Sequence, residues 1–145
     1  MEKNTLLANI LNDLMKYYTL LYKLLKKEKI NLLNLDVDNI IEITKEKDTL
    51  LLKLRLLEDE KKRLINKFFN DEIAANKILE CKKNSIMSDT FLKLSSLIQD
   101  IKKLSAVNRN LISRSLDYIN NISHFFNKTG INFNVKDSST FTREA

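Results

Sequence analysis

Apolar residues recur at alternating intervals of three and four along three long stretches of the chain, which is the spacing of one face of an α-helix. In the first stretch a second apolar row lies beside the main row and widens this face. The pattern predicts a first helix over about residues 4–33. Its main row is Leu7, Ile10, Leu14, Tyr17, Leu21 and Leu24, and the neighbouring row is Leu6, Leu11, Tyr18 and Leu25.

The pattern breaks over residues 35–39 and then resumes. Asn39 and Glu42 have the spacing of a capping box, so a second helix is expected over about residues 39–69. Because the break is short, the two helices are expected to lie antiparallel as a hairpin. The apolar row of this second helix is interrupted by two lysines. It consists of Ile40, Ile43, Lys47, Leu50, Leu54, Leu57, Lys61, Leu64 and Phe68.

The third stretch follows a segment of weaker pattern, residues 70–88, which is predicted to be a connector. Ser88 or Asp89 is the expected cap of a long helix that runs over about residues 89–128. Its main row is Phe91, Leu94, Ile98, Ile101, Ile112, Ile119, Ile122 and Phe126, and a second row at intervals of seven is Leu97, Leu104, Leu111, Tyr118 and Phe125.

The main row of the third helix is polar in its middle, where apolar residues are expected. The polar residues are Ser105, Asn108 and Ser115. One interpretation is a polar layer inside the helix interface, which lowers stability and fixes the register or the partner. The other is that this part of the helix is less buried. The sequence favours neither.

The third helix is predicted to end before Gly130, the one glycine of the chain, in the position after the last helical turn. The segment after it is polar and carries only Ile131, Phe133, Val135 and Phe141 as large apolar residues, so a mobile tail is expected over residues 129–145. The predicted fold is therefore all-α: a single domain over residues 1–128, with an antiparallel hairpin of long helices and a third long helix in a coiled-coil-like bundle.

Composition supports this and narrows the function. One glycine and no proline leave no glycine-rich phosphate loop, and 30% of the residues are charged, as in proteins made of long solvated helices. The chain shows neither a secretory signal nor an apolar run long enough to span a bilayer, and Cys81 is its single cysteine. We therefore expect a cytoplasmic protein without membrane insertion.

The net charge of +6 raises the question of nucleic-acid binding. Basic residues do not gather in one patch, and pairs such as Glu58–Lys62 and Asp59–Arg63 have the i,i+4 spacing of a solvated helix face. Nucleic-acid binding is the weaker alternative, and it would be lost steeply as salt is raised.

No catalytic, metal or cofactor site is expected. His124 has no cysteine or acidic residue at ligand spacing, and Cys81 lacks the base and the oxyanion site that a nucleophile needs. What remains is binding another protein. Most apolar rows must form the core, but the C-terminal half of the third helix carries an excess, where Tyr118, Phe125 and Phe126 join both rows.

Three blocks of the sequence resemble the FlgN family of flagellar export chaperones. They are residues 24–28 (Leu-Leu-Lys-Lys-Glu), 45–54 (Lys-Glu-Lys-Asp-Thr-Leu-Leu-Leu-Lys-Leu) and 108–119 (Asn-Arg-Asn-Leu-Ile-Ser-Arg-Ser-Leu-Asp-Tyr-Ile). The tail, from Gly130 to the closing Arg-Glu-Ala, echoes the family as well. One departure is that Thr129-Gly130 stands where the family usually has a Tyr-Gly pair.

The resemblance implies a chaperone without enzyme activity that binds the C-terminal helical segments of hook-associated proteins, which join hook and filament. It would prevent their premature association and bring them to the flagellar export gate and the export ATPase complex. If the family's tyrosine contacts the gate, this chain either uses a tail phenylalanine, for which Phe133 is the candidate, or makes the contact differently. The alternative is a self-assembling coiled-coil protein, such as a homodimer, without an export client. The residues expected to bind the client are Leu111, Ile112, Leu116, Ile119, Ile122, Phe125 and Phe126.

Overall fold

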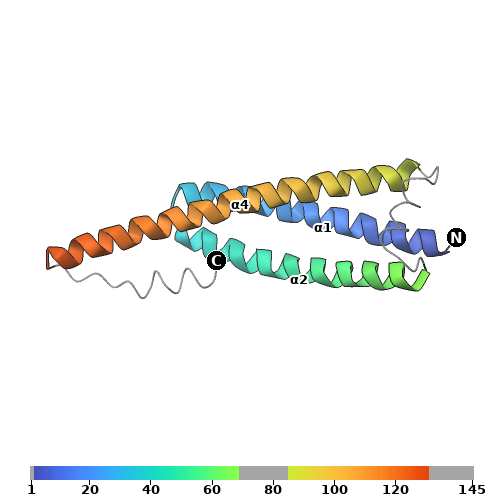
Figure 1. The fold of residues 1–145 in the computed structure, drawn as a ribbon, viewed down its shortest axis with the longest axis horizontal. Helices are drawn as coiled ribbons and strands as arrows, with labels where there is room; N and C mark the ends of the chain where they lie inside the picture. The colour runs from blue at the N-terminus through green and yellow to red at the C-terminus, as the bar shows by residue number, and fades with distance from the viewer. Residues whose placement is uncertain (1, 69–84, 131–145) are drawn as a thin grey trace. The chain divides into compact units, whose positions relative to one another are not determined.

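The computed structural model describes residues 2–68 and 85–130 (Figure 1). Within these ranges the chain forms three helices and no strand: α1 at Glu2–Leu33, α2 at Val37–Phe68 and α4 at Ser85–Lys128. The all-α fold of three long helices that the periodicity predicts is confirmed.

Two predicted segments lie wholly or largely outside the described residues. The first is the connector, of which only the end is described. This end belongs to α4, which begins at Ser85 and not at Ser88 or Asp89, so this part of the prediction is wrong. The second is the tail, of which only Thr129 and Gly130 are described.

The turn between α1 and α2 is built by two caps. Leu35 adopts a positive φ of 54°, and the amides of Leu35 and Asp36 donate to the carbonyl oxygens of Leu32 and Asn31 at 3.3 and 3.0 Å. This pair of bonds is the Schellman motif, which ends a helix and turns the chain away from its axis. Leucine occupies a conformation that glycine adopts more readily, at a cost of about 1–2 kcal/mol.

Asp36 then caps α2. Its Oδ1 accepts from the Asn39 backbone amide at 3.4 Å, and its Oδ2 accepts from the Asn39 side-chain amide at 2.6 Å. The predicted capping box at Asn39 and Glu42 is therefore wrong, and α2 begins at Val37, two residues earlier than expected. A carboxylate at this position satisfies amides that the first turn leaves free.

Contacts within the chain divide it into two compact units, each made of parts of all three helices. The first unit comprises Met1–Lys23 and Lys47–Lys102, and the second comprises Leu24–Glu46 and Lys103–Ala145. Most of the buried apolar residues fall on the predicted rows, which confirms the helical periodicity. Those of the first unit are Leu7, Ile10, Leu11, Leu14, Leu21, Leu54, Ile65, Leu94 and Ile101, and those of the second are Leu24, Leu25, Leu32, Ile40 and Ile43.

A polar contact also joins α1 to α2 in the first unit. The Tyr18 hydroxyl donates to Glu58 Oε1 at 2.9 Å, and Lys61 Nζ lies 3.0 Å from Glu58 Oε2. Glu58 is thus partly buried and pairs within its own helix at i,i+3, whereas the sequence suggested a solvated pair with Lys62. Beside it, Lys53 of α2 lies over the Tyr17 ring, 5.5 Å from the ring centroid.

We predict that Tyr18→Phe lowers the free energy of unfolding by about 1 kcal/mol at pH 7, because Glu58 loses a hydrogen-bond donor. Burial raises the pKa of the Tyr18 hydroxyl above its ordinary value, and the charge of Glu58 and their hydrogen bond add to the increase. The folded state therefore keeps this proton when the unfolded chain begins to lose it, near pH 10. Urea unfolding should show the difference between wild type and variant constant below pH 10 and shrinking above it. Tyr17→Phe is the control, and an equal loss there would show that the Glu58 contact is not the cause.

Candidate functional site

The C-terminal half of α4 is attached to the second unit by a buried polar contact. The side-chain nitrogen Nδ2 of Asn108 donates to the Leu25 carbonyl oxygen and to Glu28 Oε1, both at 2.9 Å. Asn108 is 1% exposed and Glu28 is 2% exposed. The sequence allowed either a polar layer inside the helix interface or a less buried part of the helix. At Asn108 the polar layer is therefore correct. Ser115 instead donates from Oγ to the carbonyl oxygen of Leu111 in its own helix, and it is partly exposed.

This polar contact matters because apolar burial in α4 stops before it. Leu94 and Ile101 are the last buried apolar residues of the helix within its described part. From Lys103 to Lys128 the apolar side chains are partly or largely exposed, while the buried residues are Asn108 and Ser123. The amide of Asn108 thus provides the deepest contact between this half of α4 and α1.

Beyond Asn108, α4 extends past the α1–α2 turn. Helices α1 and α4 run in the same direction (Figure 1), and Asn108 of α4 lies against Leu25 and Glu28 of α1. From Glu28, α1 continues only to Leu33, about 8 Å, whereas α4 continues from Asn108 to Lys128, about 30 Å at 1.5 Å per residue. The last three to four turns of α4 therefore have no hairpin helix opposite them. We call residues 111–128 the projecting segment.

All seven residues predicted to bind a client lie on this segment. None of them is buried: Phe125 is 60% exposed, and the other six are partly exposed. The rings of Phe125 and Phe126 meet edge to face, with centroids 5.8 Å apart. Tyr118, which lies on the predicted row at intervals of seven in α4, is also 60% exposed. The structure therefore brings these residues together on one helix, while Phe133 lies outside the described residues.

The sequence missed a second exposed apolar group, at the α1–α2 turn. Ile30, Leu33, Leu35 and Val37 are each at least 50% exposed. The one signal for it in the sequence is that Ile30 and Leu33 lie off the predicted row of α1 and cannot face the core. Because this turn also belongs to the second unit, that unit carries large exposed apolar side chains on two of its elements.

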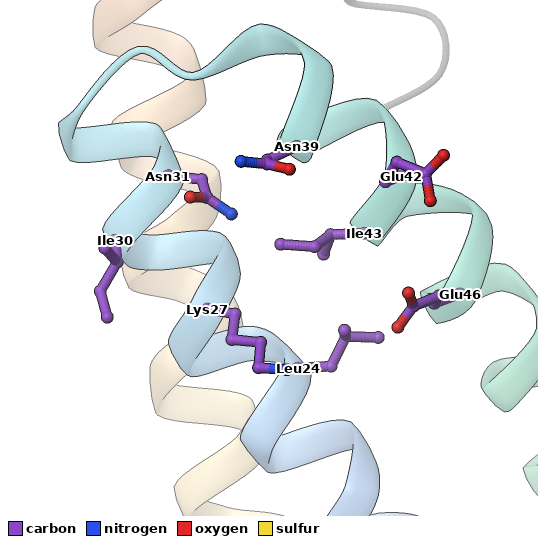
Figure 2. Close-up of a pocket in the computed structure, with 8 residues that line it drawn as sticks. All are labelled: Leu24, Lys27, Ile30, Asn31, Asn39, Glu42, Ile43 and Glu46. Carbon is purple, nitrogen blue, oxygen red and sulfur yellow. The ribbon is translucent and has the colours of Figure 1, made fainter.

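A groove between the ends of α1 and α2 lies in the same unit (Figure 2). It has a volume of about 490 Å³. The buried side chains of Leu24 and Ile43 point into the space between the helices, and the remaining lining is mostly polar or charged. The lining residues are Leu24, Lys27, Ile30, Asn31, Asn39, Glu42, Ile43 and Glu46.

A second groove, of about 380 Å³, lies between α1 and α2 in the first unit. Leu6, placed by the sequence on the widened apolar face of the first helix, is 48% exposed beside it. The lining residues are Leu6, Ile10, Glu60, Arg63, Leu64, Lys67 and Phe68. Neither groove collects a nucleophile with a base, so both are suited to binding and not to bond-making chemistry.

Metal coordination and membrane insertion can be examined only in the described part of the chain. In residues 2–68 and 85–130 no three histidine, cysteine, aspartate or glutamate side chains come close enough to hold a metal ion. Over the same ranges no helix combines the length and the apolar character needed to cross a membrane. His124 is exposed on α4.

The described residues form an all-helical protein with an exposed apolar segment at the end of α4, a surface suited to contact with another protein chain. A family model described as "FlgN protein" matches residues 1–134, and the chain belongs to the FlgN family. No curated protein and no solved structure matches the chain significantly. The family acts in flagellar assembly, so the protein is a flagellar export chaperone, a class that binds proteins and is not known for enzyme activity.

Proposed function

We propose that this chaperone binds the C-terminal helical segments of hook-associated proteins in the cytoplasm. It keeps these segments from associating early and brings them to the flagellar export gate and the export ATPase complex. One observation carries the proposal: the projecting segment of α4 presents an apolar surface that no described helix covers. In the proposed complex this surface contacts the apolar face of a client helix.

The length of this surface suits such a client. From Leu111 to Phe126 the helix spans about 23 Å, which is four turns. An amphipathic client helix of the same length presents apolar residues at intervals of three and four and can pair with all of these turns. Because the client orders only when it binds, part of the interaction energy is spent on ordering, and the complex stays reversible, as release for export requires.

The projecting segment is a better candidate than the groove of Figure 2. In that groove only Leu24 and Ile43 contribute buried apolar side chains, and Lys27, Glu42 and Glu46 place charges at its rim. A client helix there would desolvate charged groups for little apolar contact. On α4 the large apolar residues form a continuous row.

Within this proposal each predicted residue has a role. The seven apolar residues of the projecting segment contact the client, with Phe125 and Phe126 as its aromatic anchors. Aromatic side chains bury the most area per residue and often dominate binding energy. Phe133 contacts the export gate after the client has been bound.

The first test is co-purification of the chain with the C-terminal helices of hook-associated proteins from the same organism. We predict an equimolar complex that Phe126→Ala weakens about tenfold, because the variant loses an aromatic anchor. Circular dichroism should show unchanged helicity, since Phe126 is not part of the buried core. A loss of helicity in Phe126→Ala would instead assign this residue to the core of the bundle.

The same experiment separates the chaperone from a self-assembling coiled coil. Sedimentation of the free chain should give a monomer if the projecting segment is reserved for a client. A tight dimer that Phe126→Ala dissociates, with no complex at micromolar client, would replace the proposed function by self-assembly.

A further inference from the structure

We propose that the groove between α1 and α2 in the first unit docks an acidic amphipathic helix of a partner protein. Residues near the start of α1 and near the end of α2 line this groove, which has a volume of about 380 Å³. It shares no residue with the projecting segment. The inference therefore stands whether or not the client is a hook-associated protein.

The apolar part of the lining is incompletely covered by the described helices. On α1, Leu6 is 48% exposed, while Ile10, one turn later, is buried. On α2, Leu64 and Phe68 end the predicted apolar row and are partly exposed, although Ile65 between them is buried. Apolar surface of this kind favours binding when a partner removes it from water.

The two helices that form the groove are held together by contacts beside it. The Tyr18 hydroxyl donates to Glu58 Oε1 at 2.9 Å, two residues before Glu60, which lines the groove. Leu7 of α1 and Ile65 of α2 are almost fully buried. The groove is therefore formed before any partner arrives, and docking a helix there requires little rearrangement of this unit.

Arg63 and Lys67 give the α2 side of the groove a positive charge. Both are exposed, and among the residues that the structure describes neither forms an ion pair. The ammonium group of Lys67 lies 5.3 Å from the centroid of the Phe68 ring, so a cation adjoins the apolar lining. An anionic partner can therefore pair with both cations without breaking an ion pair of the described residues.

The lining residues repeat at a spacing that a partner helix can match. Three pairs of them are four positions apart, which is about 6.0 Å along a helix axis. The pairs are Leu6 and Ile10, Leu64 and Phe68, and Arg63 and Lys67. A partner helix presents the same spacing when it has apolar residues at intervals of three and four and two carboxylates four residues apart on the adjacent edge. Glu60 also lines the groove, so the partner residue beside it is neutral or basic.

An acidic helix is favoured over other occupants by charge and by the apolar lining together. The chain has a formal net charge of +6, so a second copy brings the same excess of positive charge and is repelled. A nucleic acid would pair with Arg63 and Lys67, but its phosphates and sugars would leave Leu6 without an apolar contact. A helix with one apolar face and an acidic edge satisfies both parts of the groove.

The deciding experiment titrates the full-length chain with two fluorescent helical peptides and follows their anisotropy. Both peptides carry leucine at i, i+3, i+4 and i+7, but one has glutamate along the edges of this row and the other has lysine. We expect the glutamate peptide to bind about tenfold more tightly than the lysine peptide. Leu6→Ser should weaken the glutamate peptide about fivefold, because it removes apolar contact without adding charge. The double variant Arg63→Glu with Lys67→Glu should reverse the preference, and equal binding of the two peptides to the wild type would overturn the inference.

Matched variants show where the peptide binds. Lys102→Glu with Lys103→Glu changes the net charge by the same amount on exposed residues of α4 outside the groove, and it should keep the preference for glutamate. A reversal there as well would mean that net charge alone selects the peptide, and the groove would be rejected.

Two further outcomes would place the peptide elsewhere and overturn the inference. Phe125→Ser should leave the affinity for the glutamate peptide unchanged, and a loss there equal to that of Leu6→Ser would assign the peptide to the projecting segment. Binding that Leu6→Ser does not weaken and that raised salt abolishes would indicate a site for polyanions such as nucleic acid. Circular dichroism of each variant checks that the helices are intact.

Discussion

Replacing Asn108 with leucine is expected to lower the free energy of unfolding by about 2 kcal/mol, although leucine has a similar size and is more apolar. The wild-type amide donates to Glu28 Oε1 in a site where both side chains are almost fully buried. Hydrogen bonds to a charged group contribute about 1.5–3 kcal/mol, and a buried carboxylate that loses its donor keeps the cost of desolvation. Urea unfolding followed by circular dichroism measures the change.

The control is the double variant Glu28→Leu with Asn108→Leu. Removing both partners leaves no buried charge behind, and apolar replacements of buried polar pairs are often neutral or stabilising. We expect the double variant to recover most of the stability that Asn108→Leu loses, which is a coupling that a double-mutant cycle detects. If the two single losses simply add, Asn108 and Glu28 do not act as a pair.

The polar contact also explains why a chaperone would keep an asparagine at this depth. Asn108 Oδ1 is buried and has no hydrogen-bond partner, so the site is not optimised for stability. An amide that must meet Glu28 and the Leu25 carbonyl oxygen can do so in only one register of α4 along α1. Since α4 has no buried apolar residue after Ile101, this register determines how much of its apolar surface extends past the hairpin.

The helices could be predicted from the sequence because burial follows the helical period. Leu7, Leu14 and Leu94 fall on predicted rows and are buried. Glu28 falls on the α1 row as well, seven residues after Leu21, yet a carboxylate is normally read as solvated. Its burial depends on Asn108 of α4, 80 residues away, and no local pattern contains that information.

Glu58 was misread for the same reason. Its spacing to Lys62 suggested a solvated pair, but Tyr18 of α1 supplies a donor that the periodicity of α2 cannot reveal. The cap of α2 was assigned wrongly for another reason. Asp36 and Asn39 are both residue types that cap helices, and the left-handed turn at Leu35 places Asp36 in the capping position.

The apolar excess of the candidate site could be recognised in the sequence, while its role in client binding stays a prediction. Excess apolar residues in the last half of the third helix identified Phe125 and Phe126, and the structure places Phe125 in solvent. That this half extends past α1 could not be predicted, because it depends on the register between α1 and α4, which α2 and the connector separate in the sequence. Ile30 and Leu33 lie off the predicted row of α1, and the sequence analysis assigned them no role.

The second large effect concerns binding. Phe125→Asp is expected to weaken the complex with a client helix by about 100-fold, or about 2.8 kcal/mol. It removes an aromatic anchor that is 60% exposed and places a charge where the client's apolar face must dock. Stability should change by less than about 0.5 kcal/mol, since substitutions of exposed residues away from special features are usually small. Calorimetric titration with client peptide and thermal unfolding measure the two quantities.

Leu92→Asp is the matched control. Leu92 lies on the same helix and is also 60% exposed, but it belongs to the first unit, away from the projecting segment. The same charge there should leave client affinity within about twofold of wild type. Equal weakening by both substitutions would mean that exposed apolar residues along the whole of α4 contribute alike, and the client site would then have to extend into the first unit. If neither substitution weakens binding, the groove between Leu24 and Ile43 becomes the next surface to test.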